Sequence, residues 1–146
     1  MQPGNVKKIY LAAPFFNEKE IENVEYAEKV LQEKGLSIFS PMRHSVEAGR
    51  GTPEWARMIF EMDRDEIRKA DAVVALYYGA FSDTGTAWEC GYAAAIGVPV
   101  ILVHADREAG SNLMMHAGCM TNIDLHDLAD YDFDQMPVYE YTGKMF

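Results

Sequence analysis

Residues 84–103 read Thr-Gly-Thr-Ala-Trp-Glu-Cys-Gly-Tyr-Ala-Ala-Ala-Ile-Gly-Val-Pro-Val-Ile-Leu-Val and contain the clearest signals of local structure in the chain. An Ala-rich helical segment is followed by Gly97 and Pro99, which are the usual signals that end a helix. Residues 98–103 then form an apolar, β-branched run that is typical of a buried strand. The stretch therefore predicts a helix followed by a strand, as in a repeating α/β unit.

Glu89 is the one charged residue of this stretch, and its neighbours Trp88, Cys90 and Tyr92 are uncharged. We expect residues 84–86 to form a turn and Glu89 to lie in the first turn of the helix that follows. An acid at this place is either an exposed residue that the helix dipole favours or part of a site. Both interpretations stay open at this point.

The same alternation of strands and helices extends outward along the chain. Apolar runs predict strands over residues 6–13, 36–39, 72–78, 98–103 and 118–123. Helical spacing and capping residues predict helices over residues 18–34, 53–70, 87–96 and 112–117, with a helical turn at 125–129. This pattern predicts an α/β fold with an open, parallel, five-stranded sheet and helices on both faces, in one domain over residues 1–146.

Two segments lie outside this alternation. Residues 41–52 form a loop whose glycines and mixed charges indicate mobility. Residues 131–146 form a tail that is rich in aromatic residues, and we expect it to be docked, because disordered tails are seldom so aromatic.

The composition excludes several classes of partner. A net charge of −10 argues against nucleic acid and against anionic membrane surfaces, although solubility alone would also explain it. No apolar run approaches the ~20 residues of a membrane span, and the first residues lack the pattern of a signal peptide. The two cysteines form no CxxC and are expected to be reduced thiols in a cytoplasmic protein. The four histidines lack ligand spacing, so no metal site is expected.

Aromatic and acidic residues gather where ligands bind in such sheets, beyond the carboxyl ends of the strands. Together they suit a small ligand with a flat ring and hydroxyl groups, whereas a phosphate would need glycine N–H groups and cations. Simpler explanations exist: the two phenylalanines could lie in the core, the aspartates of the second helix on a solvated face, and Asp83 could only cap a helix. The residues concerned are Tyr10, Phe15, Phe16, Asp63, Asp65, Asp83, Glu89, Asn112 and His116.

Several of these residues stand in motifs that resemble, in order, those of the nucleoside 2-deoxyribosyltransferase family. The resemblance covers essentially the whole chain and implies a flavodoxin-like fold. It also implies an enzyme of nucleotide salvage that moves a 2-deoxyribosyl group between purine or pyrimidine bases. Its partners would be 2′-deoxynucleosides and free nucleobases, and it would need no cofactor. The motifs are Ile9 to Phe16, Asp63 eight positions before Asp71, Asp83-x5-Glu89-x-Gly91-Tyr92-Ala93, Asn112-Leu113-Met114, Tyr131-Asp132-Phe133, and Tyr139-x-Tyr141-x-Gly143-x-x-Phe146.

The resemblance also implies a role for each matching residue. Glu89 would be the nucleophile, which forms a covalent deoxyribosyl-enzyme and so retains configuration. Asp63 would be the acid and base, and Tyr10 would position the nucleophile. Chemistry agrees, because a carboxylate stabilises the positive charge on the sugar and the departing base needs a proton. The implied substrate-binding residues are Phe15 and Phe16 at the base, Asp83 at the deoxyribose or base, and Asn112 and the carboxylate of Phe146 at the sugar hydroxyls.

In this family the groups that match Asn112 and Phe146 can come from a neighbouring subunit, so a homo-oligomer is expected. Two features depart from the family pattern. Pro14-Phe15 replaces what is often a Gly-aromatic pair, and the loop after the second strand carries Arg43, His44 and Arg50. The preference for purines or for both kinds of base therefore stays open.

Two other functions stay open as well. A deoxynucleoside 5′-monophosphate N-hydrolase would need a phosphate cradle of Ser, Gly and Arg after the first strand, where this chain has Ala-Ala-Pro-Phe-Phe. A non-enzymatic, acidic flavodoxin-like binding domain, such as a phospho-accepting receiver, would need an Asp after its third strand and a Lys after its fifth. Tyr77-Tyr78 and Ile123-Asp124 occupy those places.

Overall fold

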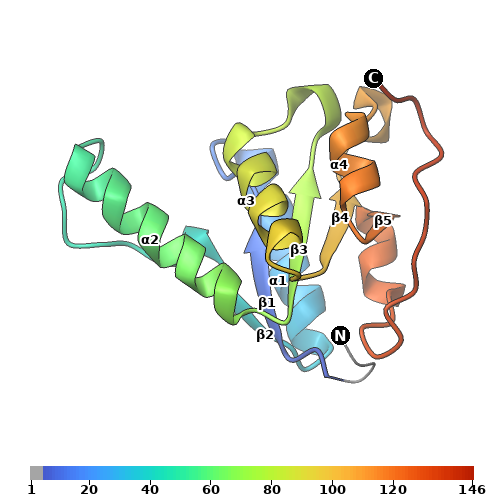
Figure 1. Cartoon of the computed structure of the whole chain (residues 1–146), viewed down its shortest axis with the longest axis horizontal. Helices are drawn as coiled ribbons and strands as arrows, with labels where there is room; N and C mark the ends of the chain where they lie inside the picture. The colour runs from blue at the N-terminus through green and yellow to red at the C-terminus, as the bar shows by residue number, and fades with distance from the viewer. Residues whose placement is uncertain (1–4) are drawn as a thin grey trace.

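Five strands form one sheet in the order β2-β1-β3-β4-β5 in the computed structural model, which describes residues 5–146 (Figure 1). All four neighbouring pairs are parallel. This confirms the predicted parallel sheet, and the strand order is that of flavodoxin. The strands are β1 (Lys8–Ala12), β2 (Ser37–Phe39), β3 (Ala72–Tyr77), β4 (Val100–His104) and β5 (Thr121–Asp124).

Helices cover both faces of the sheet, as predicted. One face packs against α1 (Glu18–Glu33) and the 3₁₀ helix η4 (Leu125–Asp130), with Val24, Leu31 and Leu128 in a shared core. The other face packs against α3 (Thr84–Ala95), α4 (Leu113–Gly118) and the end of α2 (Pro53–Lys69). Short 3₁₀ turns follow three of the strands: η1 (Pro41–Arg43), η2 (Gly79–Phe81) and η3 (Arg107–Ala109). Within residues 5–146, no helix combines the length and the apolar composition that crossing a membrane requires.

The second helix, α2, leaves the body of the molecule. Its first turns extend away from the sheet, and only its last part returns to it (Figure 1). Ile67 is its one fully buried residue. The apolar side chains of the earlier turns therefore face a space beside the sheet rather than the core.

Two boundaries differ from the predictions for local reasons. Residues 84–86 are the first turn of α3 and not a turn before it, because the Asp83 side chain accepts a hydrogen bond from the Thr86 N–H at 2.9 Å. Glu89 consequently lies in the second helical turn. The last predicted strand begins later than expected, at Thr121, because α4 continues to Gly118.

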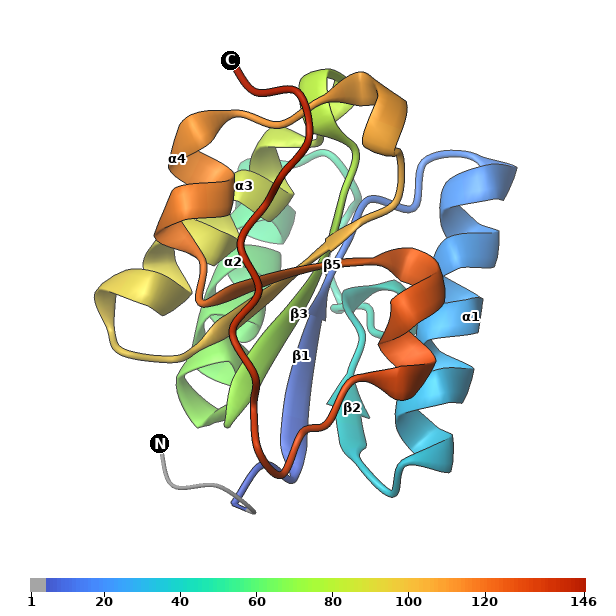
Figure 2. The same cartoon turned by 90° about the vertical axis from the view of Figure 1, so that its right-hand side faces the viewer.

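The aromatic tail is docked, as predicted. Tyr131, Phe133 and Tyr141 are buried, and the Tyr141 ring lies between two histidines with centroid distances of 4.7 Å to His104 and 4.9 Å to His116. The tail runs beside β5 (Figure 2), where the Asn122 N–H donates to the Tyr139 carbonyl at 3.0 Å. It covers an edge strand that would otherwise expose unpaired backbone groups.

Candidate active site

A cleft opens where the strand order reverses, between the carboxyl ends of β1 and β3. Neighbouring connections diverge at such a point, which is where ligands bind in open parallel sheets. The cleft has a volume of about 550 Å³, within the usual range for small-molecule sites. Its walls come from the loops after β1 and β2, one side of α2, and the start of α3.

Glu89 and Tyr10 meet at the inner end of this cleft. Tyr10 lies on the inner strand β1, is completely buried, and its hydroxyl donates a hydrogen bond to Glu89 Oε2. The Tyr10 ring stacks on Phe39 of β2 at a centroid distance of 5.7 Å. A rigid strand thus holds one oxygen of the carboxylate, while the Glu89 side chain lines the cleft. Glu89 is not the exposed helix-start acid that the sequence left as an alternative.

The surroundings of Glu89 favour its protonated form. Burial raises the pKa of Glu89 to about 7, the hydrogen bond from Tyr10 opposes this rise, and the charges of Asp63 and Asp83 add to it. Burial and the nearby Glu89 raise the pKa of the Tyr10 hydroxyl far above its usual range, so Tyr10 remains a donor. A carboxyl with a pKa near neutrality in a cleft is typical of a catalytic group.

Asp63 lies on the side of α2 that faces the cleft. Burial, and next to it the charge of Glu66, raises the pKa of Asp63 to about 6. Its Oδ1 atom is enclosed and has no hydrogen-bond partner among the described residues. A buried oxygen without a partner is costly, and it is available to a ligand in the cleft. Asp63 therefore does not lie on a solvated helix face, whereas Asp65 does, where it pairs with Arg64 and Arg68 at 3.1 and 3.4 Å.

Asp83 both caps α3 and lines the cleft. Its side chain caps α3 by accepting from both the N–H and the hydroxyl of Thr86, at 2.9 and 3.1 Å. The same residue lines the cleft beside Glu89. The simpler explanation as a helix cap is correct, and the contact with the cleft exists in addition to it.

Aromatic rings form the open part of the cleft. Phe15 and Phe16 are 37% and 76% exposed, so they are not core residues, and their rings stack at 6.2 Å. Trp55, Phe60 and Trp88 complete the lining. Sequence reasoning named the first two and missed these three. For Trp55 the signal lay in α2, where Trp55, Ile59 and Met62 recur at helical spacing.

Asn112 and Phe146 lie together but do not line this cleft. The Leu113 N–H donates to the Phe146 carbonyl at 2.8 Å, and the Phe146 N–H donates to the Ser111 carbonyl at 2.9 Å. Asn112 caps α4 through its side chain. In one chain, these two predicted sugar-binding residues are therefore near each other where the tail finishes, and neither lines the cleft that contains Glu89.

One group of side chains in the described part of the chain has the spacing to hold a metal ion, and it is not in the cleft. Ligand atoms of Asp124, His126 and Asp127 lie within 4.8 Å of one another. Arg107 already pairs with Asp124, and the other two side chains are exposed.

The cleft combines a positioned carboxyl (Glu89), aromatic rings, and a second carboxyl (Asp63) with one oxygen that no other described residue binds. Residues 9–127 match the nucleoside 2-deoxyribosyltransferase family. The chain belongs to this family. It is an enzyme of the nucleoside 2-deoxyribosyltransferase type, and its fold agrees with that of solved relatives.

Individual relatives support the assignment to the nucleoside 2-deoxyribosyltransferase family. A nucleoside deoxyribosyltransferase of Limosilactobacillus fermentum is 27% identical over 145 residues, which cover 87% of this chain and 86% of the relative. The structure of a 2-deoxyribosyltransferase from Bacillus psychrosaccharolyticus matches with a TM-score of 0.84 at 36% identity, over 92% of this chain and 99% of that chain. A CMP N-glycosidase of Clostridium botulinum matches with a TM-score of 0.58 at 22% identity, over 89% and 94% of the two chains, and this likeness concerns the fold alone.

Proposed function

We propose that this enzyme transfers a 2-deoxyribosyl group between nucleobases, with Glu89 as the covalent nucleophile. The observation that carries the proposal is the Glu89 carboxyl, held by Tyr10 in a cleft that it shares with Asp63. In a small cleft, one carboxylate can attack the sugar while the second carboxyl serves the departing base.

The reaction takes place in two displacements. A Glu89 oxygen bonds to C1′ of the deoxynucleoside, the N-glycosidic bond breaks, and its electron pair leaves with the base, which takes a proton from Asp63. A nitrogen of the second base then bonds to C1′ from the side that the first base left, the ester to Glu89 breaks, and Asp63 takes the proton back. Two inversions give net retention.

The protonation states of Glu89 and Asp63 fit these two steps. The reactive pair carries a single proton, on Asp63, while Glu89 is ionised. With pKa values of about 7 for Glu89 and about 6 for Asp63, a singly protonated pair is most abundant between these values. In the free enzyme Glu89 and Asp63 both have raised pKa values, so the proton is divided between the two carboxyls. A base nitrogen that accepts a hydrogen bond stabilises the protonated form of Asp63. When the substrate binds, the proton of the pair therefore shifts to Asp63, and the reactive form with ionised Glu89 gains population.

The substrate would lie with its sugar against Glu89 and Asp83 and its base among the aromatic rings of Phe15 and Phe16. Stacking on a flat ring tolerates different bases, which suits an exchange reaction. The chemistry itself requires no cofactor, because one base leaves and another arrives. Salvage of nucleobases in the cytoplasm is the role that we propose for this reaction.

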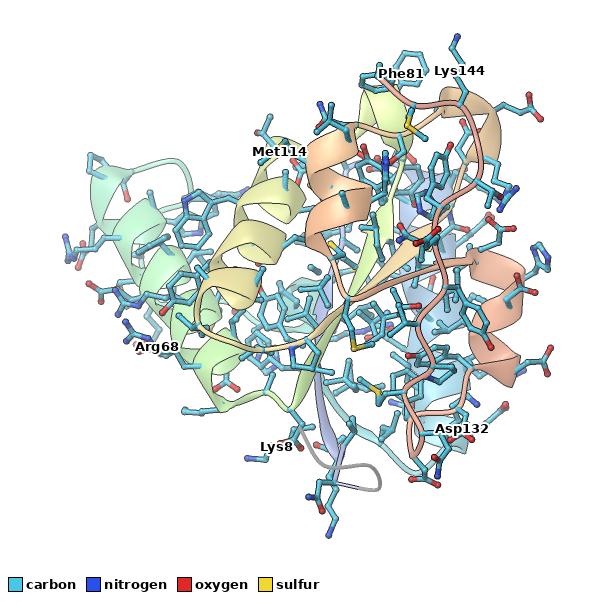
Figure 3. The ribbon with its side chains drawn as sticks, turned by 45° about the vertical axis from the view of Figure 1, so that its right-hand side comes forward. Lys8, Arg68, Phe81, Met114, Asp132 and Lys144 are labelled. Atoms are coloured by element: carbon cyan, nitrogen blue, oxygen red, sulfur yellow. The ribbon has the colours of Figure 1, made fainter. Side chains whose placement is uncertain are left out.

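We also propose that the active form is a homo-oligomer. Asn112 and Phe146 do not line the cleft of their own chain, and the end of the molecule that carries them is unusually apolar. Phe81 is 82% exposed and Met114 is 74% exposed, and both are at this end together with Lys144 (Figure 3). A second copy that covers this surface could bring Asn112 and the Phe146 carboxylate to its neighbour's sugar site.

The test is an exchange assay. The enzyme is incubated with deoxyinosine, with and without adenine, in buffer without phosphate. Formation of deoxyadenosine supports transfer. Hydrolysis that occurs only with deoxyinosine 5′-monophosphate would replace the proposal by the nucleotide N-hydrolase.

Glu89→Gln provides the matched variant for this assay. It keeps the shape and an acceptor for Tyr10 but cannot form the ester, so exchange should fall by roughly 10³-fold or more. A trapped deoxyribosyl ester on Glu89, seen as a mass increase of the wild-type protein after rapid acid quench, would be direct support. Near wild-type exchange by the variant would contradict the role of Glu89.

A further inference from the structure

The loop after β2 carries three basic side chains, Arg43, His44 and Arg50, and each has different surroundings in the structure. Arg43 turns away from the cleft to α1, where its Nε and Nη2 atoms donate to Glu28 at 3.0 and 2.7 Å. The His44 ring stacks on Phe39 at 4.1 Å. Arg50 lines the cleft, and among residues 5–146 its guanidinium has neither an ion-pair partner nor a side-chain hydrogen bond. Arg50 is therefore available to a ligand.

Local structure places Arg50 at a defined position. It stands in the turn from Gly49 to Thr52, in which the Thr52 N–H and hydroxyl both donate to the Gly49 carbonyl, at 3.1 and 2.6 Å. Gly51 has φ +86° at the position where a type II turn requires a positive value. Thr52 also caps α2. The turn that bears Arg50 is thereby joined directly to the distal end of α2.

The order of groups along α2 decides which part of a substrate Arg50 meets. Asp63, which must reach the nitrogen of the departing base, lies about 15 Å along the helix from its start at Pro53. Arg50 precedes that start, and Trp55 and Ile59 line the cleft between the two. In the proposed reaction C1′ lies at Glu89 and the departing base at Asp63. We therefore expect the base to extend along the side of α2 that lines the cleft, toward Arg50.

We infer that Arg50 recognises the exocyclic group of the base, so that the enzyme prefers 6-oxopurines, hypoxanthine and guanine, over adenine. This inference rests on the proposed transfer reaction. A guanidinium has donors only, and it pairs in a bidentate way with the O6 and N7 acceptors of a 6-oxopurine. Adenine carries an amino group where a 6-oxopurine has O6. The N–H donors of Arg50 would then face another hydrogen-bond donor.

The test is a competition between two acceptors. The enzyme is incubated with deoxyuridine and equal concentrations of hypoxanthine and adenine, and the initial ratio of deoxyinosine to deoxyadenosine is measured. Both acceptors attack the same deoxyribosyl-enzyme, so the donor step cancels from the ratio. We expect the wild-type ratio to be at least tenfold in favour of deoxyinosine. Arg50→Ala should lower the ratio at least fivefold while transfer to adenine changes by less than twofold.

Arg57→Ala is the matched control, because Arg57 is an exposed arginine of α2 that does not line the cleft, and it should leave the ratio unchanged. An unchanged ratio in Arg50→Ala, or a wild-type ratio near one or in favour of adenine, would overturn the inference and leave transfer intact. If Arg50→Ala loses activity only with 5′-phosphorylated deoxynucleoside donors, Arg50 binds a phosphate and not the base, and the inference is also overturned. If neither nucleoside forms from deoxyuridine, the competition is repeated with deoxyguanosine as the donor, because a purine-only transferase does not use deoxyuridine. If neither nucleoside forms with that donor, the proposed transfer itself fails.

Discussion

Tyr10 and Glu89 are 79 positions apart in the chain, and a hydrogen bond joins them in the fold. The tyrosine is fully buried on an inner strand of the sheet, so the carboxyl that it holds has a defined direction. Burial raises the pKa of Glu89, and the hydrogen bond from Tyr10 lowers it again. The balance between these two effects sets the pH at which the nucleophile is available.

Tyr10→Phe should displace this balance. Without the hydroxyl donor, the pKa of Glu89 should rise above its value of about 7, so the carboxylate should form only at higher pH. We expect the acidic limb of kcat/KM against pH to move upward by about one unit. At pH 6, kcat/KM should fall roughly tenfold. A lower rate with an unshifted profile would show that Tyr10 does not act through the ionisation of Glu89.

Because its pKa is raised in the folded state, Glu89 lowers the free energy of unfolding at high pH, where its carboxyl is ionised. The folded state keeps the proton up to about pH 7, whereas in the unfolded chain the carboxyl has a pKa near 4.5. The stability associated with the protonated form is therefore complete below pH 4.5 and is lost as the pH rises through 7.

Glu89→Gln should accordingly be more stable than the wild type at pH 8, by roughly 1–3 kcal/mol of unfolding free energy, and equal to it near pH 4. Urea unfolding at both pH values measures this difference. A variant that is less stable than the wild type at pH 8 would contradict the raised pKa.

At the scale of elements, the site depends on how two helices begin and where they lie. The cap of α3 was recognisable from Asp83 in the sequence, although the structure extends the helix back to Thr84. The position of α2 was not recognisable. Its apolar spacing predicted a helix packed on the sheet, but most of that apolar face lines the cleft instead. Periodicity shows which face of a helix is apolar, and it does not show what that face meets.

Substitutions of Asp83 can separate its role as the cap of α3 from its role in the cleft. Asn caps a helix about as well as Asp, so Asp83→Asn should leave the unfolding free energy within about 0.5 kcal/mol. It removes the charge beside Glu89 and a ligand for substrate, and kcat/KM should fall roughly tenfold or more.

Asp83→Ala should lose the cap as well, at a cost of about 1 kcal/mol. Thermal unfolding and exchange kinetics of both variants test this separation. If Asp83→Asn is fully active, Asp83 is a cap and nothing more.

At the scale of the whole molecule, the sheet order brings together loops that are distant in the chain. The residues after β1, β2 and β3 meet because β1 lies between β2 and β3. The tail finishes against the start of α4, held by the hydrogen bonds between residues 111–113 and Phe146, and neither Asn112 nor Phe146 lines the cleft. In the proposed homo-oligomer, a complete site would join two copies, each of which contributes different residues.

Complementation between variants tests this arrangement. Glu89→Gln and Asn112→Ala should each be inactive alone. When they are mixed under conditions that exchange subunits, some sites combine an intact Glu89 with a partner's intact Asn112. We expect recovery of up to about a quarter of the wild-type activity. No recovery in a mixture shown to contain hybrid oligomers would mean that Asn112 acts within its own chain or not at all.

Residues appended after Phe146 test the same surface differently. They would displace the terminal carboxylate, so KM for the deoxynucleoside should rise severalfold while thermal stability is kept. Full activity of an extended or strictly monomeric protein would contradict the shared site.

The sequence by itself determined the alternation of strands and helices, the parallel sheet, and the ordered motifs of the family, because periodicity, caps and helix-ending residues are local properties of the chain. It also named Tyr10, Asp63 and Glu89. Only the tertiary structure decided that these three converge and that, within residues 5–146, one oxygen of Asp63 has no hydrogen-bond partner. It also decided that Arg43 pairs with Glu28 while Arg50 lines the cleft. Burial and convergence depend on which segments pack together, and that packing joins residues tens of positions apart.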